Sequence, residues 1–113
     1  MKLTLPLPPS HNRLWRAVNG RVIRSKEYRD WIRDCGPWLM LAKGEPLEGA
    51  VIVVLDVYFR DRRRDADSAI KPVLDILQGT AYANDRQVRA ITLVAHIDRD
   101  NPRVEAQIKE WLT

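Results

Sequence analysis

The run from Val51 to Phe59, largely β-branched and apolar, is the strongest strand signal in the chain. Apolar residues on both faces of an extended segment are typical of a central strand that is covered on both sides. Weaker strand signals lie at residues 2–7, which end among prolines, and at 88–97. Residues 103–111 alternate between apolar and polar positions after a turn sequence, so we expect them to form a terminal hairpin with 88–97.

Two segments carry apolar residues at helical spacing. The first follows Ser25, which is a good N-cap, and we expect Gly36-Pro37 to break or kink it before a continuation at 38–42. The second ends at Gly79 and contains Pro72. Because proline is tolerated only in the first turn, this helix should not begin much before residue 68.

A short cationic hairpin is predicted near the amino end of the chain. Asn19-Gly20 separates residues 14–18 from 21–24, and this dipeptide favours a tight turn between two strands. Several arginines make the hairpin and its approach strongly basic, among them Arg13, Arg16 and Arg21.

Composition is typical of one globular domain over residues 1–113, with 45% hydrophobic residues and a net charge of +4. A single cysteine excludes an intramolecular disulfide, and one cysteine with two histidines does not make a usual structural zinc site. No apolar run resembles a signal peptide or a membrane span. We therefore expect a cytoplasmic protein with no membrane partner.

The residues that follow the central strand carry the strongest chemical signal. Arg62, Arg63 and Arg64 run directly into Asp65 and Asp67. Arginines attract phosphate, and clustered carboxylates attract a hard divalent cation. Residues two apart in extended chain point the same way, so the two aspartates can share one metal ion. The combination indicates metal-assisted chemistry on a nucleic-acid backbone.

Lys71 and Asp85 are candidates to complete such a site. Lys71 lies four residues beyond Asp67 and can reach the same phosphate. Asp85 becomes a third carboxylate if its loop folds back beside the start of the second helix. Oxygen ligands of this kind suit Mg²⁺, which polarises a phosphodiester and lowers the pKa of an attacking water.

Each of these features also has an ordinary structural explanation. Asp-x-Asp is commonly a solvated turn or an N-cap, and an arginine run is commonly a solvated surface. Lys71 has the spacing of an ion-pair partner of Asp67, and Asp85 after Asn84 is typical of a turn. From the residues alone, a metal-dependent nuclease and a passive basic surface both stay open.

Three ordered motifs resemble the RusA family of crossover-junction endodeoxyribonucleases, which are Holliday-junction resolvases. They are a proline-rich opening that leads into Asn12-Arg13, the stretch from Arg62 to Lys71, and the stretch from Asn84 to Val88. The chain departs from the family pattern at Ser68, where Asn is frequent, and at Asn84, where Asp is frequent. Ser68 keeps a hydroxyl that can cap the helix, whereas Asn84 removes one negative charge near the metal.

The resemblance implies a fold, a site and a cofactor. The family's three essential aspartates fall on Asp65, Asp67 and Asp85, and its catalytic lysine falls on Lys71. It also implies Mg²⁺, a homodimer and an α/β fold in which a mixed sheet packs with two main helices.

The expected function is Mg²⁺-dependent resolution of four-way DNA junctions by paired nicks, in recombination and repair. A junction has near two-fold symmetry, so a C₂ dimer with one site per subunit supplies two matched nicks. The strand at 103–111 and the apolar helix faces are candidate dimer surfaces. Two alternatives are a non-catalytic protein that binds branched DNA and a nuclease specific for other branched DNA. The residues expected to hold the DNA backbone are Arg13, Arg16, Arg21, Arg62, Arg63 and Arg64.

Overall fold

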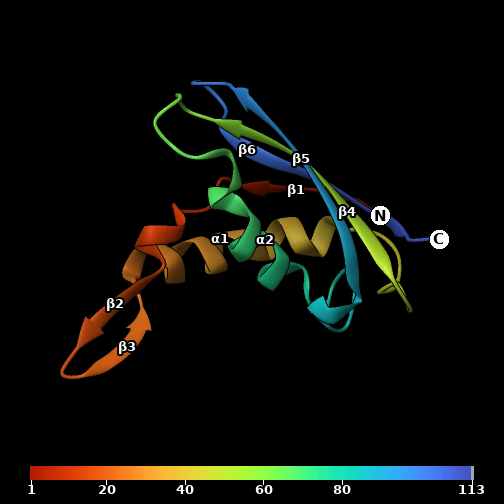
Figure 1. The fold of residues 1–113 in the computed structure, drawn as a ribbon, viewed down its shortest axis with the longest axis horizontal. Helices are drawn as coiled ribbons and strands as arrows, with labels where there is room; N and C mark the ends of the chain where they lie inside the picture. Colours follow the sequence, from red (N-terminus) through yellow and green to blue (C-terminus); the bar gives the residue numbers. More distant parts are fainter. Residues whose placement is uncertain (113) are drawn as a thin grey trace.

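The computed structural model describes residues 1–112, and its main feature is one mixed four-stranded sheet (Figure 1). The strands lie in the order β1-β6-β4-β5, so β4 is central. β4 runs parallel to β5 and antiparallel to β6, and β6 runs antiparallel to β1. Their bounds are β1 (Lys2–Pro6), β4 (Val51–Phe59), β5 (Val88–Ile97) and β6 (Arg103–Glu110).

Two helices, α1 (Lys26–Leu41) and α2 (Ile70–Leu77), cover one face of this sheet (Figure 1). Alternate residues of β4, from Val51 to Phe59, are buried on the helix side, where they meet Trp31 of α1 and Val73 of α2 in one hydrophobic core. The expected α/β fold, a mixed sheet packed with two main helices, is confirmed. No helix among the described residues is long and apolar enough to cross a membrane.

The cationic hairpin consists of β2 (Trp15–Val18) and β3 (Arg21–Arg24), and it projects away from the sheet (Figure 1). Asn19 and Gly20 at its tip have φ values of 51° and 77°, the left-handed conformations that a tight hairpin turn requires. The sequence predicted this hairpin correctly. Three short 3₁₀ helices complete the described structure, namely η1 (His11–Arg13), η2 (Ala66–Ala69) and η3 (Asp85–Gln87).

The predicted terminal hairpin of β5 with β6 is wrong. α2 connects β4 to β5, and β5 lies parallel to β4 along one edge of that strand. The turn after β5 then crosses the end of β4, so that β6 pairs with the other edge of β4. The Asp98 amide donates to the Phe59 carbonyl at 2.8 Å at this crossing. β6 therefore pairs along both edges within the chain, with β1 and β4, so neither edge of this strand is available to form a dimer.

Two further expectations need correction. α1 continues through Gly36-Pro37 without a break, because proline removes only one helical hydrogen bond while Tyr28, Trp31 and Cys35 hold the helix against the core. The outer face of β4 is half-buried rather than fully covered, since both helices lie on the opposite face. The buried residues of both helices pack into the core, whereas Trp38, Met40 and Leu41 at the end of α1 are exposed.

The start of α2 agrees with the position of Pro72. This proline is the third residue of the helix, within the first turn, and the 3₁₀ turn η2 precedes it. Asp65 and Asp67 consequently lie at the junction between strand and helix, as predicted.

Replacing Leu55 with alanine tests the central position of β4. Leu55 is fully buried, so Leu55→Ala should lower the free energy of unfolding by about 2–5 kcal/mol. Val54→Ala on the half-buried outer face is the matched control and should cost clearly less. Urea denaturation followed by circular dichroism measures both, and equal losses would contradict the described orientation of the strand.

Candidate active site

Asp65, Asp67 and Lys71 line one hollow of about 560 Å³ at the start of α2. Asp65 has extended backbone and is the N-cap of η2, whereas Asp67 lies in the first turn of η2. The sequence prediction assumed extended chain at both aspartates, so the local geometry differs from that expectation. The two carboxylates still reach the same space, and the ammonium of Lys71 brings a positive charge to it.

The opposite wall of this hollow comes from the amino-terminal loop. Ser10, His11 and Asn12 line the hollow together with the two aspartates. His11 and Asn12 are also exposed to solvent. Sequence reasoning noted the Asn12-Arg13 pair in a motif but did not place these residues beside the carboxylates. No local pattern reveals a contact between segments more than 50 residues apart.

Arg64 joins the two walls. Its Nη1 donates to the carbonyl of Pro8 at 2.7 Å, and its Nε donates to Oγ of Ser68 at 3.1 Å. Its guanidinium also lies 5.2 Å from the ring centroid of Phe59. The Nη2 atom is buried and has no hydrogen-bond partner among the described residues. Burial lowers the pKa of Arg64 from its ordinary value, because the charged form is partly desolvated.

Ser68 does not cap α2 as expected. The N-cap of α2 is Ala69, which has no side-chain capping bond, and Ser68 lies buried inside η2. Its hydroxyl accepts the hydrogen bond from Arg64 instead. The side-chain amide oxygen of an asparagine offers the same kind of acceptor, which makes this departure from the family pattern structurally mild.

Lys71 pairs with Asp75 rather than with Asp67. The Lys71 Nζ and Asp75 Oδ1 atoms are 3.0 Å apart, at i,i+4 spacing on α2. The hydrogen bond to Asp75 raises the pKa of Lys71, and the charge of Asp85 raises it further. The lysine is therefore held in its protonated form beside the carboxylate hollow. Asp75 was missed by sequence reasoning, although its spacing from Lys71 was a readable signal.

Asp85 lies outside this hollow, at the first position of η3. Its backbone N–H donates to the side-chain oxygen of Gln78 at 3.2 Å, while Asn84 caps η3 and forms a capping box with Gln87. The Gln87 side chain also donates to the carbonyls of Leu47 and Gly49, at 2.8 and 2.9 Å. Asn84 thus has a structural role that does not require a metal.

Within residues 1–112, no three His, Cys, Asp or Glu side chains lie together in a group that could hold a metal ion. The structure thus brings together Asp65, Asp67 and Lys71, and it leaves Asp85 apart from the aspartate pair.

The other arginines expected to hold DNA are exposed at the surface. Arg62 and Arg63 are exposed on the loop after β4, and Arg63 lines the carboxylate hollow. Arg16 and Arg21 are exposed on the projecting hairpin. Arg13 lies at the base of the hairpin, where it is 4.0 Å from Glu27. Arg64 differs from this group because its charge is used inside the protein.

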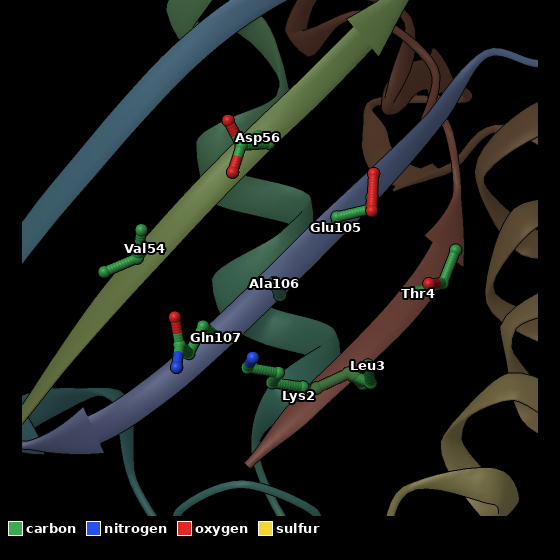
Figure 2. Close-up of a pocket in the computed structure, with 8 residues that line it drawn as sticks. All are labelled: Lys2, Leu3, Thr4, Val54, Asp56, Glu105, Ala106 and Gln107. Carbon is green, nitrogen blue, oxygen red and sulfur yellow. The ribbon is translucent and has the colours of Figure 1, made fainter.

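A second hollow, of about 330 Å³, lies on the outer face of the sheet over β1, β4 and β6 (Figure 2). Its charged lining consists of Lys2, Asp56 and Glu105. Figure 2 shows α2 behind the strands, so this hollow opens on the face opposite the helices. It contains no arginine and shares no lining residue with the carboxylate hollow.

A protein that acts on a phosphodiester backbone is expected to carry carboxylates, a protonated lysine and exposed arginines. The family model described as Endodeoxyribonuclease RusA matches residues 6–109 of the 113-residue chain. The chain belongs to the RusA family of endodeoxyribonucleases and is, by that membership, a nuclease that hydrolyses phosphodiester bonds. No curated protein matches the chain significantly.

Arg64→Ala should destabilise the protein, whereas Arg63→Ala should not. The Arg64→Ala variant lacks the two hydrogen bonds that join the amino-terminal loop to η2. We expect their removal to lower the free energy of unfolding by about 1–3 kcal/mol. Arg63 is exposed, so its change should stay within about 0.5 kcal/mol. Chemical denaturation of both variants gives the comparison, and equal stability would refute a structural role of Arg64.

Proposed function

We propose that this protein is a Mg²⁺-dependent, homodimeric endonuclease that resolves four-way DNA junctions in recombination and repair. The observation that carries the proposal is the shared hollow of Asp65, Asp67 and Lys71 in a chain of the RusA family. The exposed arginines around this hollow support binding to a DNA backbone. A single buried cysteine is compatible with work in the reducing cytoplasm.

The aspartate pair fits Mg²⁺. This cation is usually bound through one or two carboxylates, with substrate phosphates and several waters as its other ligands. Asp65 and Asp67 supply two carboxylates on one open hollow, and phosphate oxygens of DNA would complete the set. When bound, the ion would polarise the scissile phosphodiester and activate the attacking water. Asp85 as a third ligand stays a prediction, and its charge acts on Lys71 of the same hollow.

Lys71 is assigned to the scissile phosphate. Its ammonium is held by Asp75 at the edge of the hollow, and the hydrogen bond to Asp75 raises the pKa of this lysine further above neutral pH. A fixed positive charge at this place stabilises the negative charge that develops on the phosphate oxygens during attack. Asp75 would then act as a positioning residue for the lysine.

The remaining cations are assigned to the DNA backbone. Arg62 and Arg63 lie beside the hollow, and Arg16 and Arg21 extend this basic surface onto the β2–β3 hairpin. Contacts to phosphate position a strand without reading its sequence. A homodimer would present two such surfaces to the symmetric arms of one junction. The dimer is proposed here from the symmetry of the substrate.

Asp67→Asn should lower cleavage of a labelled four-way junction by more than about a hundredfold in Mg²⁺, because it removes one of two carboxylate ligands. Junction binding should be kept or tightened, since a negative charge beside DNA is lost. A nicking assay and a binding titration on the same folded protein measure the two effects.

The controls separate the alternatives. We expect the wild type to make symmetric, Mg²⁺-dependent nicks in four-way DNA and to cut flap or linear duplex DNA only a little. Preferred cutting of flaps would assign another branched substrate, and tight binding without cutting in any divalent metal would identify a non-catalytic DNA-binding protein. Loss of binding by folded Asp67→Asn would refute the assignment of this residue as a metal ligand.

Replacing both Arg62 and Arg63 with alanine should weaken junction binding and flatten its salt dependence. Each lost phosphate contact should reduce the slope of log K against log salt by roughly one. Binding isotherms at several salt concentrations give this slope for the wild type and the double variant. An unchanged slope would exclude these two arginines from the DNA contact surface.

A further inference from the structure

One face of the projecting β2–β3 hairpin is apolar and open to solvent. Residues directly opposite each other in an antiparallel pair share a face, and so do residues two apart along one strand. The register therefore places four side chains on one face, in the pairs Trp15↔Arg24 and Ala17↔Val22. The exposed fraction is 49% for Trp15 and 72% for Val22. Large apolar side chains that meet water together commonly mark a binding surface.

The other face of the hairpin is basic. It carries two arginines and two aliphatic residues, in the pairs Arg16↔Ile23 and Val18↔Arg21. Residues 11–26, which contain the whole hairpin, include four arginines and no Asp or Glu. Such charge favours a polyanion as the occupant of this element over an apolar protein surface. A nucleic acid whose bases are accessible offers both the negative charge and flat apolar surfaces for stacking.

The base of the hairpin is fixed to the rest of the protein. The amide of Ser25 donates to the Leu14 carbonyl at 2.9 Å, and its hydroxyl donates to the Arg13 carbonyl at 2.6 Å. The ring of Tyr28 on α1 makes a T-shaped contact with Trp15, with centroids 5.8 Å apart. The indole is therefore held in place while half of its surface stays open to a ligand.

The hairpin follows directly from one wall of the carboxylate hollow. Asn12 lines that hollow in η1, and β2 begins at Trp15. Three residues of chain span at most about 11 Å between Cα atoms. This length corresponds to roughly three nucleotide steps along a duplex. A DNA strand with a phosphate in the hollow therefore passes close to the indole.

We propose that the apolar face of the hairpin, formed by Trp15, Ala17 and Val22, covers bases that lack a stacking neighbour at the branch point of the DNA substrate. This inference rests on the proposed function and adds the element that distinguishes a branch point from continuous duplex. Each base pair inside a duplex is covered by its neighbours, so an apolar face finds no base to stack on. Stacking is interrupted at a branch point, where apolar side chains replace the missing neighbour. The basic face, with Arg16 and Arg21, is left for the phosphates of the adjoining arms.

The test compares substitutions on the two faces of the hairpin in the full chain. Trp15→Ala removes the stacking surface, whereas Trp15→Phe keeps an aromatic ring. Val22→Thr changes the apolar face without adding charge, and Ile23→Thr makes a comparable change on the basic face as the matched control. Affinities for a four-way junction and for linear duplex with the same arm sequences are measured in EDTA, so that binding is recorded without cleavage.

Trp15→Ala should weaken junction binding by about tenfold or more, and duplex binding by less than about threefold. Trp15→Phe should recover most of this loss. Val22→Thr should weaken junction binding more than Ile23→Thr does. The base analogue 2-aminopurine, placed at the branch point, should change its fluorescence when the wild type binds, and Trp15→Ala should reduce that change.

The outcomes are distinct. A loss specific to the four-way junction, recovered by Trp15→Phe, supports the inference. Equal losses on junction and duplex, or no loss on either, overturn it, and a changed sedimentation of Trp15→Ala without DNA would assign the face to a protein partner instead. If Trp15→Ala fails to fold, the comparison of Val22→Thr with Ile23→Thr decides.

The proposed function is tested separately by cleavage in Mg²⁺. A wild type that prefers four-way DNA but does not cut it would refute the nuclease activity and leave the comparison of the hairpin variants valid. A wild type that cuts junctions while all hairpin variants bind them normally would refute the stacking face alone. A wild type that binds junction and duplex equally would overturn the stacking face together with the preference for branched DNA.

Discussion

The half-buried guanidinium of Arg64 makes the contacts on which the site depends. Moving a charge out of water is costly unless hydrogen bonds replace the lost solvent, so the groups around it are constrained in position. Its partners are the carbonyl of Pro8, the hydroxyl of Ser68 and the ring of Phe59. These belong to the amino-terminal loop, the start of the helical segment and the end of the central strand. The hollow has two walls because one side chain holds these three segments together.

Local signals in the sequence predicted most of the elements correctly. The apolar run at β4, the Asn19-Gly20 turn and the constraint from Pro72 each act through nearby residues, and each agreed with the structure. Strand order depends on connections between distant segments, and for this reason the expected β5–β6 hairpin was wrong. α1 continues through Pro37 for a similar reason, because packing against the sheet outweighs the tendency of proline to break a helix.

The candidate site was predictable to a similar extent. The sequence predicted that Asp65, Asp67 and Lys71 could act together, and they line one hollow. It could not reveal the wall formed by residues 10–12, nor that Arg64 would serve inside the protein while Arg62 and Arg63 stay at the surface. Three neighbouring arginines look alike in sequence, and only the packing around each one distinguishes their roles.

The strand order also has a consequence for the synthesis of the protein. β1 pairs only with β6 among the described elements. The terminal ammonium of Met1 donates to the Ile108 carbonyl, and the Ile108 amide donates to the Met1 carbonyl, across almost the whole chain. Contacts between such distant residues slow folding, because a long loop must close before they form. A nascent chain on the ribosome cannot complete its sheet until β6 has emerged. The first strand made must wait for the last, so a partly translated nuclease would lack the finished sheet that supports its site.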